Sequence, residues 1–247
     1  MNKIEVSPIG LVKSPFKEKF AIPRQPGLVP EARGVLELFS PYDDPLAVRG
    51  LDGFSHIWLI FLFHETPQQP WKPTVRPPRL GGNDRVGVFA SRSPYRPNSI
   101  GQSVVKLERI EILSGRARLH IAGIDLLDQT PVLDIKPYLP YSDCITSASA
   151  GYAGVPPENK LQVEFSERAT SQCVELAKEH DVDMQTLIVQ LLQNDPRPAY
   201  RAEKPGKMEY GFKLYNFDVK CLVRDNAIQV DALEPIRQRS TDRRARG

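Results

Sequence analysis

The sequence predicts a mainly β first half followed by a smaller α+β unit. Proline accounts for 23 of the 247 residues, and seven of these lie between Pro67 and Pro97. Because proline has no backbone N–H, long helices are disfavoured in this half of the chain. Short apolar segments joined by Gly and Pro turns favour a barrel or a sandwich instead.

The expected strands of the first half carry distinct side-chain patterns. Residues 54–63 are apolar on both faces, as in a fully buried strand. Within 103–113, two pairs of alternating apolar residues are out of phase with each other. This shift in the alternation predicts a bulge near Glu108 and Arg109. Ser114-Gly115 predicts a hairpin turn into a strand that alternates apolar and polar residues. The expected strands are 54–63, 86–90, 103–113, 116–121 and 132–135.

The second half shows helical periodicity for the first time. Ser166 is expected to cap a helix over 167–180, and 184–193 predicts a second helix. Alternating apolar residues from Tyr215 to Val223 predict a strand, which 228–230 can pair with across an Asp225-Asn226 turn. We therefore expect a first domain at 1–145, a linker at 146–159, an α+β domain at 160–236 that begins with a strand at 161–165, and a flexible basic tail at 237–247.

Composition excludes several classes of protein. Apolar residues make up 40% of the chain and charged residues 26%, as in an ordinary globular protein. The longest apolar run, Ile57–Phe63, is far shorter than the roughly 20 residues of a membrane helix, and no signal segment precedes it, so a cytoplasmic location is expected.

Three scattered cysteines predict buried thiols. His56 and His64 would lie roughly 26 Å apart along a strand, so no metal site is expected.

The formal net charge of +3 is unevenly distributed. Residues 72–118 hold ten basic and three acidic side chains, whereas 141–236 hold ten basic and fifteen acidic ones. The tail at 237–247 adds five arginines and one aspartate. The positive charge of the chain is therefore concentrated at 72–118 and in the tail.

No common nucleotide-binding motif occurs in the sequence. A G-x-G-x-x-G turn and a P-loop are both missing, which disfavours a Rossmann-type enzyme. Three polar, proline-rich segments remain as candidates for a preformed pocket. They could equally be rigid connecting loops with solvated arginines. They are residues 12–27, 89–101 and 125–138.

These segments resemble the signature of a known family, TsaA-like or TrmO. The resemblance is carried by Ser91-Arg92-Ser93-Pro94-Tyr95-Arg96-Pro97-Asn98-Ser99-Ile100-Gly101, by 75–83 and by Asp134-Ile135-Lys136-Pro137-Tyr138. The order and spacing match over roughly residues 4–141, and Asp195-Pro196-Arg197-Pro198-Ala199-Tyr200 resembles a motif of the family's second domain. Two positions depart from the pattern: Ser99 stands where proline is common, and Gln129 where glycine is common.

The resemblance implies a homodimeric, S-adenosylmethionine-dependent tRNA methyltransferase. Its reaction would be methylation of N6 in N6-threonylcarbamoyladenosine, 3′ of the anticodon of threonine tRNA. Its catalytic domain would be a small single-sheet β-barrel. The residues implied in cofactor binding are Arg24, Gln25, Pro26, His64, Glu65, Arg92, Gln102, Asp125, Leu126, Leu127 and Asp128.

Further residues are assigned by the same resemblance. Asp134, Lys136 and Tyr138 are expected to serve catalysis or substrate binding, although a strand-end ion pair would explain them as well. Arg76, Arg79, Tyr95, Arg96, Asp195, Arg197 and Tyr200 are the expected RNA contacts, the last three competing with a structural role at a helix end. Two other functions stay open, a non-catalytic RNA-binding barrel and a hydrolase of a small anionic metabolite.

Overall fold

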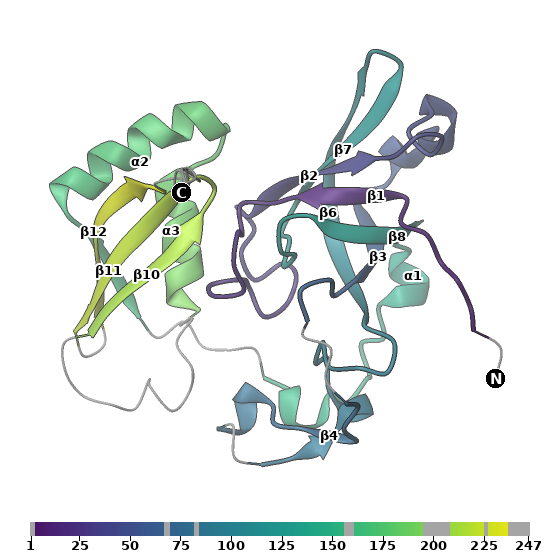
Figure 1. Cartoon of the computed structure of the whole chain (residues 1–247), viewed down its shortest axis with the longest axis horizontal. Coiled ribbons are helices and arrows are strands. Elements are labelled where there is room, and N and C mark those ends of the chain that lie inside the picture. The colour runs from purple at the N-terminus through teal and green to yellow at the C-terminus, as the bar shows by residue number, and fades with distance from the viewer. Residues whose placement is uncertain are drawn as a thin grey trace, which may run out of the picture.

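The computed structural model describes residues 3–66, 70–81, 84–155, 161–194, 208–224 and 227–236. Figure 1 shows two β units, with the smaller one beside the larger. The larger is a closed barrel with the strand order β1-β2-β7-β6-β3-β8. Its strands are β1 Gly10–Lys13, β2 Arg33–Leu38, β3 His56–Leu62, β6 Ile100–Leu113, β7 Arg116–Ala122 and β8 Thr130–Pro137. The predicted barrel is thus confirmed.

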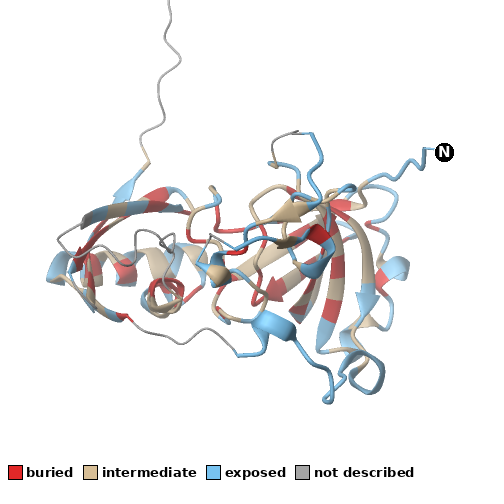
Figure 2. Cartoon of the chain, turned by 90° about the horizontal axis from the view of Figure 1, so that it is seen from below, coloured by how far each residue is buried: buried red, intermediate tan, exposed pale blue. Residues whose placement is uncertain are grey.

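The barrel core is built by alternation along its strands. Ile57, Leu59 and Phe61 of β3 point inward and are buried, while the intervening Trp58 and Ile60 face outward and are only half-buried. The expectation that this strand is fully buried on both faces was therefore wrong. Figure 2 shows the buried positions spaced along the barrel strands.

The β6–β7 hairpin confirms two predictions. The register between β6 and β7 shifts between Leu107 and Arg109, which leaves Glu108 as the extra residue of a bulge. Ser114 and Gly115 both have positive φ, 51° and 75°, as a two-residue turn between twisted antiparallel strands requires.

A short excursion leaves the barrel between β3 and β6. It contains the two-stranded pair β4 Thr74–Val75 and β5 Val86–Gly87. The predicted strand over 86–90 was too long, because the chain turns after Gly87 into a 3₁₀ segment at Val88–Ala90. Other 3₁₀ segments, η1, η2, η3 and η5, span Pro45–Val48, Leu51–Gly53, Pro78–Leu80 and Gly151–Ala153, and a four-residue helix α1 spans Pro140–Asp143.

The second unit packs two helices on a four-stranded sheet of order β10-β11-β12-β9. Ser166 accepts a hydrogen bond from Ala169 N, 3.0 Å away, and caps α2, so the predicted helix start is confirmed. The buried Met184, Leu187 and Ile188 of α3 form part of the core. The bounds are β9 Gln162–Phe165, α2 Glu167–His180, α3 Met184–Gln193, β10 Met208–Leu214, β11 Phe217–Arg224 and β12 Ala227–Pro235.

The cysteines follow the sequence prediction only in part. Cys173 and Cys221 are buried in the second unit, where burial raises the pKa of the Cys173 thiol to about 11 and that of Cys221 to about 12. Cys144 is exposed because it follows the surface helix α1, so a buried thiol was the wrong expectation there. The Asp225-Asn226 turn lies outside the described residues.

Candidate active site

Loops from several parts of the chain meet at one end of the barrel. Since the barrel is antiparallel, β1, β3 and β7 end where β2, β6 and β8 begin. The connecting segments at this end are 14–32, 63–66 and 123–129, and the segment 91–99 leads into β6. Four of the predicted cofactor regions are therefore brought to this end by topology.

Asp125 is the carboxylate at this end of the barrel whose pKa departs most from its ordinary value. Its Oδ1 accepts a hydrogen bond from Ser103 Oγ at 2.7 Å, and Ser103 points into the barrel and is buried. Burial raises the pKa of Asp125 to about 6, and the Ser103 hydrogen bond and the nearby Arg92 charge offset only part of that rise. A carboxylate held in this way is well suited to bind a polar or cationic ligand group.

Arg92 and Gln25 join the same cluster from two other loops. Arg92 Nη1 donates to Gln25 Oε1 at 2.5 Å. The loop that carries Gln25 is fixed to the segment before Asp125 by a hydrogen bond from Gly27 N to Gly123 O at 2.8 Å. Gly123 has φ 70°, and a Cβ there would lie 3.4 Å from Gly27 Cα, so a larger residue would be strained. We name Gln25, Arg92, Ser103 and Asp125 the barrel-end cluster.

Asp128 has a different environment from Asp125. It accepts hydrogen bonds from Ser14 N at 2.9 Å and Lys17 Nζ at 2.7 Å. Burial opposes its ionisation, but Lys17 and Ser14 outweigh burial and hold the pKa of Asp128 below its usual value. The neighbouring Leu126 is buried, and its carbonyl accepts from Ser14 Oγ at 2.7 Å. Asp128 and Leu126 therefore anchor the segment after β1, beside the half-buried Leu127.

The remaining predicted cofactor residues lie at the edge of this end or outside it. His64 and Glu65 follow β3 and are exposed, and the Glu65 carbonyl accepts a hydrogen bond from Lys19 Nζ. Arg24 is exposed and Pro26 half-buried on either side of Gln25. Gln102 pairs with Ile60 across β6 and β3, which places it on the outer face of the barrel.

The predicted catalytic residues lie on the outer wall of the barrel. Asp134 pairs with Ile60 and Lys136 with Trp58, both outward-facing positions of β3. Asp134 Oδ2 and Lys136 Nζ are 3.0 Å apart and both side chains are about half-exposed. The Tyr138 ring lies 5.9 Å from the Trp58 ring. We name Asp134, Lys136 and Tyr138 the outer-wall set.

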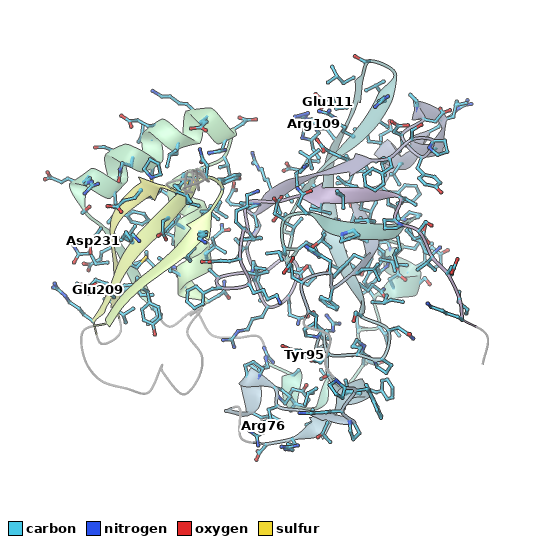
Figure 3. The ribbon with its side chains drawn as sticks, viewed as in Figure 1. Arg76, Tyr95, Arg109, Glu111, Glu209 and Asp231 are labelled. Carbon is cyan, nitrogen blue, oxygen red and sulfur yellow. The ribbon has the colours of Figure 1, made fainter. Side chains whose placement is uncertain are left out.

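The excursion carries the predicted RNA contacts of the first domain. Arg76 and Arg79 are exposed, and Figure 3 shows Arg76 and Tyr95 on this excursion, away from the barrel strands. Arg96 instead donates to the Ser91 carbonyl at 2.7 Å, and its guanidinium lies 5.8 Å from the Phe89 ring centroid. Arg96 therefore stiffens the loop. Asp195, Arg197 and Tyr200 lie outside the described residues.

Two residues of interest received no individual role from the sequence, although Phe89 lies in the candidate segment 89–101. Ser103 is a polar residue at an inward position of β6, a signal that was available in the alternation itself. Phe89 is 74% exposed beside Arg96, and only its place next to the motif could have singled it out. Among the described residues, no group of His, Cys, Asp or Glu side chains is arranged to hold a metal ion. No described helix is long and apolar enough to cross a membrane.

Comparison with known proteins adds to this geometry. The family model for the tRNA-methyltransferase O N-terminal domain matches residues 11–144, and that for the TrmO C-terminal domain matches 158–236. A protein of Escherichia coli K12 named tRNA (adenine(37)-N6)-methyltransferase is 47% identical over 95% of this chain and 100% of its own length.

One sequence and one solved structure from Pseudomonas aeruginosa are similar as well. The sequence, named putative S-adenosylmethionine-dependent methyltransferase RcsF, is 52% identical over 87% of this chain and 90% of its own length. The solved structure is a crystal structure of TrmO that superposes with a TM-score of 0.79 at 44% identity, covering 94% of this chain and 98% of its own.

Proposed function

The chain belongs to the tRNA-methyltransferase O family, and from this premise we propose that it methylates N6 of N6-threonylcarbamoyladenosine, 3′ of the anticodon of threonine tRNA. It is a tRNA adenine-N6 methyltransferase whose methyl donor is S-adenosylmethionine. We place its active site at the barrel-end cluster, because Gln25, Arg92 and Asp125 meet there from three loops.

The cluster has the donors and acceptors that S-adenosylmethionine needs. When bound, the cofactor supplies an activated methyl group on a sulfonium. Arg92 would hold the methionine carboxylate by charge-assisted hydrogen bonds. The Asp125 carboxylate would accept from the ribose hydroxyls or from the amino group. Gln25, which already contacts Arg92, would keep the guanidinium in place.

The acceptor determines what else the enzyme has to provide. N6 of the modified adenosine belongs to a urea-like group, so its lone pair is delocalised and weakly nucleophilic. The protein therefore has to align the reacting atoms and exclude water. A carboxylate near the acceptor N–H would assist by taking up the proton. Asp134 would serve in this way only if the substrate reached the outer wall, where Lys136 now neutralises it.

The excursion offers a surface for the tRNA. Arg76 and Arg79 are exposed cations for phosphates, and Tyr95 and Phe89 are exposed aromatic rings on which an unpaired anticodon-loop base can stack. Changing both arginines to alanine should weaken tRNA binding and flatten its dependence on salt. Unchanged affinity and slope would remove this surface from the proposal.

We also propose that the enzyme works as a homodimer in the cytoplasm.

Nucleoside mass spectrometry provides the direct test. Threonylcarbamoylated threonine tRNA is incubated with the protein and S-adenosylmethionine, and we expect one added methyl group on the modified adenosine. A non-catalytic RNA-binding barrel would bind the tRNA without saturable binding of S-adenosylmethionine. A hydrolase would act on a small anion without either of them. An unmethylated nucleoside would refute the proposed reaction.

A further inference from the structure

The loop between β1 and β2 is held by the C-terminal domain at both of its ends. This loop, residues 14–32, carries the predicted cofactor residues Arg24, Gln25 and Pro26 in its middle. In Figure 1 it lies on the side of the barrel that faces the second unit. The first half of the loop contacts both units, because Ser14 and Lys17 bond Asp128 of the barrel beside the residues that contact the second unit.

The first half of the loop lies along the open side of β10. The Tyr215 amide donates to the Pro15 carbonyl at 2.7 Å, and Phe16 forms a β-bridge with Leu214. Both Phe16 and Leu214 are buried. The Lys213 amide donates to Glu18 Oε1 at 2.9 Å. These contacts continue the sheet of the second domain into the loop.

An aromatic contact extends this attachment. The rings of Phe20 and Tyr210 are stacked, with centroids 6.1 Å apart and planes 5° from parallel. Lys213 Nζ also lies 3.8 Å from Glu18 Oε2. Glu18 therefore contacts both the backbone and the side chain of one residue of β10.

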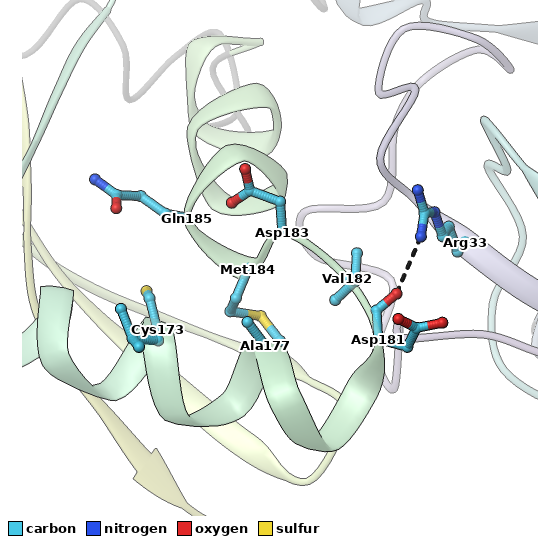
Figure 4. Close-up of a pocket in the computed structure, with 9 residues that line it drawn as sticks. Arg33, Cys173, Ala177, Asp181, Val182, Asp183, Met184 and Gln185 are labelled. Carbon is cyan, nitrogen blue, oxygen red and sulfur yellow. Dashed lines mark hydrogen bonds between the residues drawn. The ribbon is translucent and has the colours of Figure 1, made fainter.

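The end of the loop is attached to the helices of the same domain. Gln190 of α3 accepts a hydrogen bond from the Glu31 amide at 3.1 Å. Arg33 Nη1 donates to the Asp181 carbonyl, just after α2, at 3.0 Å, as Figure 4 shows. Here Arg33 lines one side of a pocket of about 440 Å³ whose other side is α2 and the start of α3.

The middle of the loop contacts the barrel. Gln25 meets Arg92, and Gly27 meets Gly123. We propose that the C-terminal domain positions the S-adenosylmethionine-binding loop, with Glu18 and Gln190 as the positioning residues. This inference rests on the proposed function, and it extends that function by giving the second domain a part in cofactor binding, separate from any contact with tRNA.

The physical reason is the cost of ordering a loop. Each backbone residue that is fixed loses conformational entropy, so a loop already fixed at both ends loses less when a ligand binds. Releasing one anchor should weaken S-adenosylmethionine binding about three- to tenfold, the effect expected from a single hydrogen bond. Turnover at saturating cofactor should change much less.

The experiment compares two anchor variants and their double with matched controls in the full-length protein. The variants are Glu18→Ala and Gln190→Ala. The controls are Glu164→Ala, an exposed glutamate of β9, and Gln185→Ala, an exposed glutamine on the same helix as Gln190. Glu18→Gln keeps the oxygen that accepts from the Lys213 amide, so it should restore binding. Titration calorimetry measures the Kd for S-adenosylmethionine, and steady-state kinetics separates kcat from both KM values.

Hydrogen exchange gives a readout that needs no cofactor. The peptide covering residues 21–29 should exchange faster in the double variant and at the wild-type rate in both controls. We expect the Kd and the KM for S-adenosylmethionine to rise in the anchor variants, with the KM for tRNA unchanged. A rise confined to the KM for tRNA, or wild-type exchange and Kd in the double variant, would overturn the inference. Wild-type protein that does not bind S-adenosylmethionine would instead refute the proposed function itself.

Discussion

The barrel-end cluster and the outer-wall set are built in opposite ways. Gln25, Arg92 and Asp125 come from three loops far apart in sequence, and the barrel topology brings them together. Asp134 and Lys136 are neighbours on one strand and satisfy each other at 3.0 Å. Burial raises the pKa of Asp125, whereas the side chains of Asp134 and Lys136 are about half-exposed. Residues that converge from distant segments are therefore the better candidates for binding a ligand.

The largest expected effect distinguishes the barrel-end cluster from the outer-wall set. Arg92→Ala should weaken S-adenosylmethionine binding about 10- to 100-fold, because charge-assisted hydrogen bonds contribute about 1.5–3 kcal/mol. Lys136→Ala removes a cation of the same charge from the outer wall and should change the Kd less than about twofold. Titration calorimetry on both variants checks this. A larger loss with Lys136→Ala would reverse the comparison.

The next effect concerns stability and its dependence on pH. Because the pKa of Asp125 is raised to about 6, the folded protein binds this proton more tightly than the unfolded chain. The free energy of unfolding should therefore fall as pH rises from about 4 to 6 and stay lower above. Asp125→Asn should be more stable than wild type at pH 8 by about 1–3 kcal/mol, and the difference should shrink toward pH 4. Urea unfolding across this range measures it, and a constant difference would contradict the assignment.

Asp128 should show the opposite sign. Its lowered pKa means that its ionised form is stabilised in the fold, through Lys17 and Ser14. Asp128→Ala should lower the free energy of unfolding by about 1–2 kcal/mol near pH 7. That loss should shrink as pH falls from the ordinary value of 3.8 through the lower pKa of the folded protein. Thermal unfolding at pH 7 and pH 3 compares the two, and a variant as stable as wild type at pH 7 would show that this anchor is dispensable.

The smallest effect is expected on the outer wall. The Asp134–Lys136 pair is half-exposed, so the double variant Asp134→Asn/Lys136→Met should change the free energy of unfolding by less than about 0.5 kcal/mol. The Kd for S-adenosylmethionine should also stay at the wild-type value. Calorimetry and denaturant unfolding measure both quantities. Weakened cofactor binding would place the outer wall inside the cofactor site.

Much of the fold could be predicted from local patterns. The bulge at Glu108, the turn at Ser114-Gly115 and the cap at Ser166 each depend on residues next to one another in sequence. The strands β1, β2 and β10 were not predicted. β1 has only four residues, and β10 is interrupted by Gly211, so neither offers a long alternating pattern.

The sequence named residues of the candidate site but did not predict how they are arranged. The family resemblance named Gln25, Arg92 and Asp125, but the contacts among them depend on barrel closure, which local sequence does not contain. Gln129 gives one physical reason for a family pattern. Its φ is 65°, in the left-handed region that favours glycine, the residue common at this position in the family. The contacts of Glu18 and Gln190 join segments far apart in the chain and had no sequence signal.

The attachment of the loop to β10 has a consequence beyond cofactor binding. The barrel is closed and has no free edge, but β10 is the outermost strand of an open sheet. Edge strands present unpaired N–H and C=O groups that can pair with another chain and start aggregation. Pro15, Phe16 and Glu18 occupy this side of Lys213–Tyr215. The loop of the first domain thus covers an edge of the second sheet, and a change that separates the two domains would expose a surface on which copies of the protein could assemble.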